Sequence, residues 1–149
     1  LRPIVTSVVD DFNSIYMNKR GIKISLNSNQ NGNKIEIMGI ENRIEQILAN
    51  LLENSISFSE DNKKIMVKLS KKNNSVMLDV LDEGSGFNEN DTKKIFKRFY
   101  SNRPGKFGEH SGLGLNIVKN LIDLHGGTIS ASNNNRGKGA KIEIIFPSA

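Results

Sequence analysis

Two asparagines, four residues apart, are the first side chains of this chain whose type and spacing suggest chemistry. Asn50 and Asn54 stand at the two ends of the run Asn-Leu-Leu-Glu-Asn, and residues four apart on a helix share one face. Asparagine is a poor residue inside a helix, because its amide competes for backbone hydrogen bonds. The pair indicates either a solvated polar face or an oxygen-donor face for a metal–phosphate complex. An amide oxygen is a hard, uncharged ligand that suits Mg²⁺.

A carboxylate followed by two glycines is the second such group. Asp82 ends an alternating, strand-like run, and Gly84 and Gly86 come directly after it. A strand-ending turn with glycines at positive φ accounts for this segment. So does a carboxylate that accepts a hydrogen bond from the amino group of adenine, with glycines that let the backbone approach the base.

The third group is the run Gly112-Leu113-Gly114-Leu115, which opens a segment of helical periodicity. The first N–H groups of a helix lack partners and lie at the positive end of its dipole, so a helix start that carries glycines suits phosphate. The alternative is a loop-to-helix junction with flexible glycines. The run is not a P-loop, because no Gly-Lys-Ser/Thr follows it.

The spacing of apolar residues predicts the elements that must position these groups. Helical spacing predicts helices over 3–19, ended by Gly21, over 41–57, and over 113–124, closed by Gly126-Gly127. Alternation predicts strands around 22–26, at Ile35 and Ile37, over 64–71 and 75–82 as a hairpin, and over 128–133 and 139–146. Helices and mostly antiparallel strands in blocks predict a two-layer α+β sandwich, with the sheet on one side and three helices on the other.

Length and composition limit the possible functions. The 149 residues indicate a single domain over 1–149 that buries its own core. The chain has no cysteine, which excludes a disulfide framework and a thiolate metal site. The net charge of +5 comes from scattered lysines without an aromatic-basic platform, so we expect no nucleic-acid partner. The first residue is Leu, so we expect a fragment of a longer protein.

The order of the three groups is more informative than any one of them. With the run Ile-Phe-Lys-Arg-Phe-Tyr at 95–100 between the second and the third, they closely resemble the catalytic and ATP-binding domain of sensor histidine kinases. That family lies within the larger GHKL group, which also holds type II topoisomerase ATPase domains, the Hsp90 chaperone and MutL. The resemblance extends from about Val8 to Pro147. It implies the GHKL (Bergerat) form of the two-layer α/β sandwich, with a mixed, mostly antiparallel sheet and an ATP lid.

The resemblance also implies roles for the residues of the first two groups. Asn54 matches the residue that holds the Mg²⁺ bridging the phosphates. Asn50 stands where the hydrolysing members of the larger group carry a glutamate that activates water, and an amide cannot act as a base. Asp82 matches the carboxylate that reads adenine, with Gly84 and Gly86 beside it. Phe58 stands where the family often has an aromatic residue that stacks on adenine.

The later segments carry the phosphate contacts that the resemblance implies. Arg98 matches an arginine that reaches the phosphates, and it lies between Phe96 and Phe99, which match the family's phenylalanine motif and also suit simple packing. The run Gly112-Leu113-Gly114-Leu115 would cradle phosphate. The long polar stretch at 97–111, with Gly105 and Gly108 as hinges, would form the lid. Its sequence is similar to that of the ChvG/ExoS type of envelope-sensing kinase.

Two departures from the family pattern stand out. Many sensor kinases have a phosphate-contacting lysine three residues after the second asparagine, where this chain has Ser57. Phosphate charge would then be met by Arg98, Mg²⁺ and lid residues. The phospho-acceptor histidine motif is also missing, since His110 falls in the predicted lid and His125 caps a predicted helix end.

The implied function is that of a protein histidine kinase fragment. It binds ATP with Mg²⁺ and transfers the γ-phosphoryl to a histidine on its own dimerisation and phosphotransfer domain, from which a response regulator receives it. The fragment would be monomeric and cytoplasmic, and the whole protein a homodimer at the membrane. Two alternatives remain open: a nucleotide-sensing regulatory module without transfer activity, which Ser57 favours, and an anti-sigma-type serine kinase. Asn50 disfavours a gyrase-type hydrolase.

Overall fold

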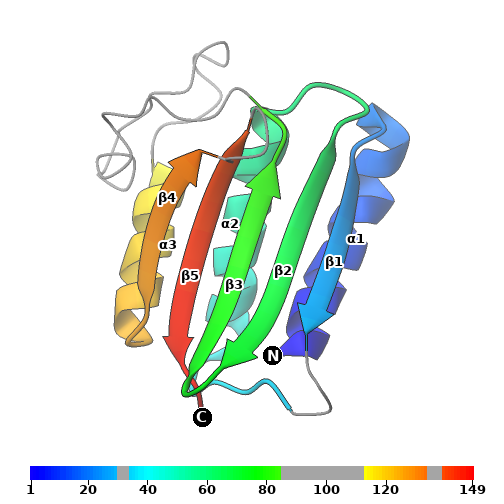
Figure 1. Ribbon diagram of the computed structural model, residues 1–149. Coiled ribbons are helices and arrows are strands. Elements are labelled where there is room, and N and C mark those ends of the chain that lie inside the picture. Colours follow the sequence, from blue (N-terminus) through cyan, green and yellow to red (C-terminus); the bar gives the residue numbers. More distant parts are fainter. Residues whose placement is uncertain (30–33, 85–112, 134–138) are drawn as a thin grey trace.

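A five-stranded sheet covered on one face by three helices makes up the described part of the chain (Figure 1). The computed structural model describes residues 1–29, 34–84, 113–133 and 139–149. The strand order is β1-β2-β3-β5-β4, in which β1 and β2 run parallel and the other neighbours antiparallel. The predicted α+β sandwich with a mixed, mostly antiparallel sheet is therefore confirmed.

The three helices are α1 (Arg2–Arg20), α2 (Glu41–Ser57) and α3 (Leu113–Leu124). Each lies within one residue of its predicted bounds at both ends. The N–H of Gly21 bonds the carbonyl oxygen of Met17 at the end of α1. Gly21 itself has φ 66°, in the left-handed region, where glycine avoids the cost of a side chain.

The strands are β1 (Lys23–Asn29), β2 (Lys64–Lys72), β3 (Ser75–Asp82), β4 (Thr128–Asn133) and β5 (Ala140–Pro147). The predicted hairpin is present, with Ile65 opposite Asp82 and Lys72 opposite Ser75. Asn73, in the connecting turn, has φ 56°, a conformation that asparagine tolerates better than most residues.

The predicted short strand at Ile35 and Ile37 is wrong, because residues 34–37 have no regular structure. The alternation instead reflects burial of Ile35, which is 3% exposed. The carbonyl of Ile35 accepts a hydrogen bond from the amino group of Leu1, and the carbonyl of Glu36 accepts one from the N–H of Ala149. These backbone groups are satisfied by the two ends of the chain rather than by a sheet partner.

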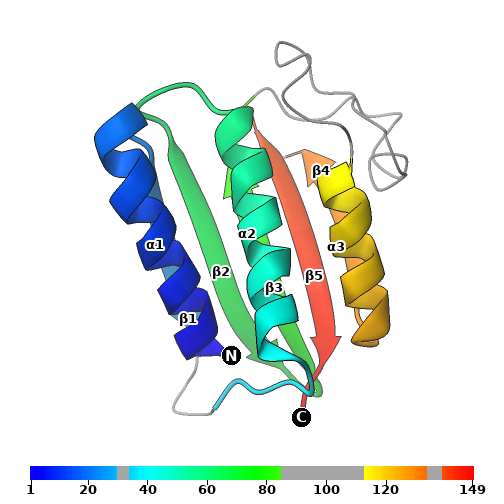
Figure 2. The same ribbon diagram turned by 180° about the vertical axis from the view of Figure 1, so that it is seen from behind.

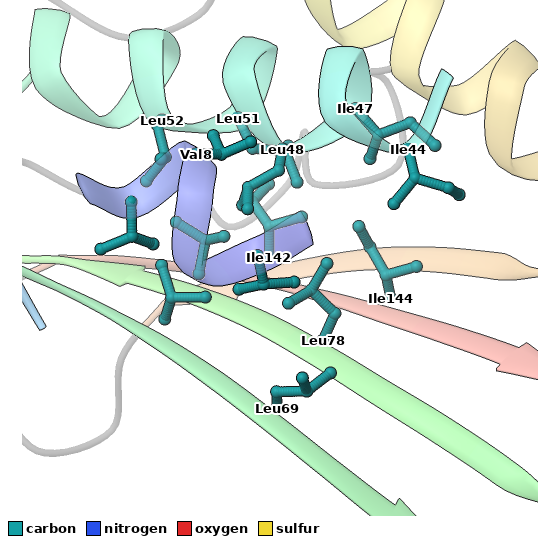
Figure 3. Packing of buried hydrophobic residues seen from close by; sticks show 14 of the residues in the cluster. Val8, Ile44, Ile47, Leu48, Leu51, Leu52, Leu69, Leu78, Ile142 and Ile144 are labelled. Atoms are coloured by element: carbon teal, nitrogen blue, oxygen red, sulfur yellow. The ribbon is translucent and has the colours of Figure 1, made fainter. Parts of the chain in front are cut away.

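The core lies between the sheet and the helices (Figure 3). Leu48 and Leu51 of α2 point toward the sheet, where Leu78 of β3 and Ile142 and Ile144 of β5 meet them. All five side chains are at most 2% exposed. Burying a side chain of this size typically contributes about 1.5–3 kcal/mol, so this layer places α2 firmly over the centre of the sheet.

Helices α2 and α3 run antiparallel side by side (Figure 2). His125, just beyond α3, joins the C-terminal end of α3 to the N-terminal end of α2. Its Nδ1 donates to the carbonyl oxygen of Leu121 at 2.7 Å, and its Nε2 accepts from the N–H of Ile40 at 3.2 Å. A carbonyl can only accept and a backbone N–H can only donate, so the imidazole is the neutral tautomer protonated at Nδ1.

Candidate functional site

The predicted site residues that the structure describes gather at one end of the molecule. At this end, at the top of Figures 1 and 2, β3 and α2 end while β5 and α3 begin. Asn54 and Phe58 come from the end of α2, and Asp82 and Gly84 from the end of β3. The sheet order and the antiparallel helix pair bring these segments together, although they are distant in the sequence.

Asp82 is the best-defined residue of this site. It is 3% exposed, and its Oδ1 accepts hydrogen bonds from the N–H of Gly84 at 2.9 Å and from the N–H of Ala140 at 3.1 Å. Ala140 is the first residue of β5. Two donors on one oxygen hold the carboxylate in one orientation. A carboxylate has about four acceptor positions, which is more than these two bonds use.

Gly139 is a residue that the sequence reading missed. It has φ 137°, and a Cβ at this position would collide with the carbonyl oxygen of Asp82 and come within 3.2 Å of the Cα of Glu83. A side chain there would displace either the backbone of Asp82 or that of β5. The signal in the sequence was the run Gly-Lys-Gly directly before the last strand, where a close approach of two backbones calls for glycine.

The start of β2 is tied to the same turn. Oε1 of Glu83 accepts a hydrogen bond from the N–H of Lys64 at 2.7 Å. The turn at Asp82 and Glu83 is therefore held from both sides, by β2 through the side chain of Glu83 and by β5 through the side chain of Asp82. This second tie was also missed, because nothing in the local sequence links Glu83 to Lys64.

Asn54 lies inside the molecule rather than on a solvated face. It is 9% exposed, whereas Asn50 is half-buried. The carbonyl oxygen of Asn54 accepts from the hydroxyl of Ser57 at 2.8 Å, and no hydrogen bond joins its side-chain amide to another of the described residues. The prediction that Asn54 lies on a solvated polar face is therefore wrong.

Phe58 follows α2 and is 9% exposed. Next to it, the hydroxyl of Ser59 donates to the carbonyl oxygen of Ser55 at 2.7 Å. The aromatic ring is thus largely enclosed by protein, and its role as an adenine-stacking residue stays a prediction.

The start of α3 is at the same end of the molecule, with Leu113 as its first residue. Gly114 is exposed, and a Cβ added to it would meet nothing within 4 Å among the described residues. Leu115 packs partly against the core. Gly86, Phe96, Arg98, Phe99, His110, Gly112 and the predicted lid lie outside the described residues.

The chain matches one family model over residues 39–149, described as histidine kinase-, DNA gyrase B-, and HSP90-like ATPase. The chain belongs to this family. Two relatives are sensor proteins named ChvG. That of Rhizobium meliloti is 40% identical over 118 residues, and the match covers 74% of this chain and 20% of that protein. That of Agrobacterium fabrum is 39% identical over 120 residues, which is 76% of this chain and 20% of that protein. The chain thus spans about a fifth of these relatives.

Solved histidine kinases of this family share the fold. The catalytic domain of ThkA, free of nucleotide, has a TM-score of 0.84 at 26% identity, and the match covers 99% of this chain and 91% of the ThkA chain. Full-length ShkA in complex with AMPPNP has a TM-score of 0.81 at 26% identity, and the match covers 99% of this chain and 30% of the ShkA chain. ThkA in complex with the response regulator TrrA has a TM-score of 0.81 at 25% identity, and the match covers 100% of this chain and 40% of the ThkA chain. These matches confirm the predicted family resemblance and fold class.

Among the described residues, no helix is both long enough and apolar enough to cross a bilayer.

Proposed function

We propose that this domain binds ATP with Mg²⁺ and transfers the γ-phosphoryl to a histidine on a separate dimerisation domain. The observation that carries the proposal is the fixed carboxylate of Asp82, held by the N–H groups of Gly84 and Ala140 at the end of the sheet where α2 ends and α3 begins. This orientation suits a carboxylate that accepts from the amino group of adenine. A relative of the same fold was solved with AMPPNP, an ATP analogue, which supports the choice of ligand.

Asn54 suits the metal that the family implies. Asn54 lies in the last turns of α2 and is 9% exposed, and an amide oxygen is a ligand that Mg²⁺ accepts. Bound Mg²⁺ would offset phosphate charge. Gly114 at the start of α3 leaves room for phosphate oxygens near the N–H groups of the first helical turn.

The transfer itself rests on positioning more than on covalent help from this chain. The bond between the γ-phosphorus and the bridging oxygen of ATP breaks, a bond to a ring nitrogen of the acceptor histidine forms, and ADP leaves. Asn50 supplies no base for water, so hydrolysis is not favoured. Arg98 would offset the charge of the γ-phosphoryl group. The acceptor histidine belongs to the dimerisation domain, and a response regulator would then take the phosphoryl group, since a relative was solved with its regulator.

Two other functions need to be separated from this one. A module that only senses nucleotide is favoured by Ser57, which stands where many kinases have a phosphate-contacting lysine and whose hydroxyl instead bonds the carbonyl of Asn54. An anti-sigma-type serine kinase shares the same motifs. Neither explanation changes the nucleotide site itself.

The deciding experiment is transfer from γ-labelled Mg-ATP. The isolated domain is incubated alone and with its separately expressed dimerisation domain. We expect no label on the domain alone, and label on the added domain that acid removes, as phosphohistidine requires. Binding of ATP without transfer to that domain would indicate the sensing module. Acid-stable label on a different protein would indicate the serine kinase, and label on His110 or His125 would contradict the proposed division of roles.

A further inference from the structure

Arg20, the last residue of α1, makes three side-chain hydrogen bonds to the end of α2 and the segment that follows it. Its Nη1 donates to the carbonyl oxygen of Ile56 at 2.8 Å, and its Nη2 donates to that of Ser59 at 2.5 Å. Its Nε donates to Oδ1 of Asp61 at 2.8 Å. The side chain of Arg20 is 25% exposed, so the guanidinium is largely enclosed by these partners.

These contacts add to the cap at the end of α2. The last carbonyls of a helix have no partner within the helix, and many helices end on a left-handed glycine that satisfies them. Helix α2 ends at Ser57, and its C-cap residue Phe58 is not left-handed, with φ −101° and ψ 2°. The carbonyl oxygen of Ile56 also accepts from the N–H of Ser59 at 3.2 Å. The guanidinium of Arg20 supplies donors to the carbonyls of Ile56 and Ser59, and its positive charge lies at the negative end of the helix dipole.

The backbone of α1 adds a fourth bond to the same segment. The carbonyl oxygen of Arg20 accepts from the N–H of Asn62 at 2.9 Å. The end of α1 therefore holds residues 56–62 at four points. Of these, the contact with Asp61 contributes least, because that side chain is 66% exposed and exposed ion pairs are weak.

The held segment contains the residues proposed to meet the nucleotide. Phe58 lies between the two carbonyls that Arg20 binds, and Asn54 precedes Ile56 by two residues on the same helix. The last turn is also joined internally, because the hydroxyl of Ser57 bonds the carbonyl of Asn54. A shift of the segment away from α1 would move the aromatic ring and the amide together.

We propose that Arg20 is a positioning residue of the nucleotide site, which sets the place of Phe58 and Asn54 by holding the end of α2 against α1. This inference rests on the nucleotide binding proposed above. Lysine cannot take over the role in full, since its ammonium is a single point on a flexible stem, whereas the planar guanidinium reaches three acceptors at fixed angles. Nucleotide affinity thus depends on a residue from a different helix.

The test compares nucleotide affinity with stability in matched variants. Arg20→Gln removes the charge and most donors, and Arg20→Lys keeps the charge but loses the planar fork of donors. Asp61→Asn weakens the ion pair but leaves the carbonyl contacts. Val9→Ala, at a buried position of the same helix, lowers stability without touching the segment. Calorimetry with an ATP analogue is run well below the unfolding temperature of every variant, because lost stability then leaves the dissociation constant of the native form unchanged.

We expect Arg20→Gln to weaken binding of the ATP analogue roughly tenfold, equivalent to about 1.4 kcal/mol. The affinity of Arg20→Lys should lie between that of Arg20→Gln and that of wild type. Asp61→Asn and Val9→Ala should bind within about twofold of wild type. The ring signals of Phe58 in NMR spectra should shift in Arg20→Gln and stay in place in Val9→Ala. If Arg20→Gln does not fold, the affinity and the Phe58 signals of Arg20→Lys decide whether Arg20 positions the site.

Wild-type affinity in the Arg20 variants, or Phe58 signals that do not move, would overturn the positioning role. Failure of the wild-type domain to bind any adenine nucleotide would instead overturn the proposed function. The two failures are therefore distinguishable in the same experiment.

Discussion

Asp82 and Ala140 lie 58 residues apart in the sequence, and a hydrogen bond of 3.1 Å joins the backbone N–H of Ala140 to Oδ1 of Asp82. The bond links the end of β3 to the start of β5, and Gly139 makes the close approach possible. The orientation of the carboxylate is thus decided by a neighbouring strand as well as by its own turn.

Gly139→Ala should destabilise the domain. The added Cβ collides with the carbonyl of Asp82, and the positive φ adds backbone strain, so we expect a loss of at least about 1–3 kcal/mol in the free energy of unfolding. Urea titration followed by circular dichroism measures it. Gly114→Ala is the matched control, because open space surrounds that Cβ and alanine favours a helix by about 0.5–1 kcal/mol.

The same pair of variants separates folding from binding. Gly114→Ala should keep or raise stability yet weaken ATP binding, since its methyl group occupies the space proposed for phosphate. Full ATP affinity in Gly114→Ala would contradict a phosphate site at the start of α3.

Asp82→Asn should lower affinity for adenine nucleotides while the fold is kept. The amide oxygen still accepts from Gly84 and Ala140, but the amide nitrogen is a donor and cannot accept from the adenine amino group. Losing a hydrogen bond to a charged group typically costs about 1.5–3 kcal/mol, or roughly ten- to a hundredfold in affinity. Calorimetry with ATP, ADP and GTP measures it. Equal binding of all three by the wild-type domain would rule out adenine recognition by Asp82.

Asn54→Ala should remove most of the Mg²⁺ dependence of ATP binding, because the variant loses the proposed oxygen ligand. The measurement is ATP affinity with Mg²⁺ and with EDTA, compared between wild type and variant. Unchanged enhancement of binding by Mg²⁺ in Asn54→Ala would show that the metal is held elsewhere.

Asn50→Glu should instead raise the slow ATPase rate, since a carboxylate at this half-buried position would supply a base for water. Phosphate release under single-turnover conditions measures it. A hydrolysis rate equal to wild type, with ATP binding intact, would argue against water having access to this face of α2.

Asp79→Asn should stabilise the domain at neutral pH. Asp79 lies in β3 and is 8% exposed, and its Oδ1 has no hydrogen-bond partner in the part of the chain that the structure describes. Burial raises the pKa of its carboxyl, with Lys141 and Lys68 lowering it and Glu143 raising it. A raised folded pKa means that this group favours the native state below its unfolded pKa, and that this contribution is lost as pH rises through the folded value.

The variant should therefore gain on the order of 1 kcal/mol in unfolding free energy at pH 7. The gain should disappear below about pH 4, where the wild-type carboxyl is protonated in both states. Asp123→Asn, which removes an exposed ion pair with Lys119, is the control and should change little at either pH. A pH-independent difference between Asp79→Asn and wild type would exclude titration of this carboxyl as the cause.

The secondary-structure elements and the types of residue in the site could be predicted from local sequence patterns. The predicted bounds of the helices and of the five observed strands lie within a few residues of those in the structure. The reason is that a helix or strand with one buried face repeats its apolar residues at a fixed local period. Asn54 and Asp82 were found because an amide inside an amphipathic helix and a carboxylate before glycines are locally unusual. The order of these motifs was enough to place the chain in its family.

How these residues are held depends on tertiary contacts that no local pattern predicts. The bonds from Ala140 to Asp82, from Lys64 to Glu83 and from Arg20 to the end of α2 each join segments that local patterns treat as independent. For the same reason Ile35 was misread as part of a strand. Its apolar side chain showed that it would be buried, but a strand also requires a neighbouring backbone to pair with, and the identity of that neighbour depends on how distant segments meet.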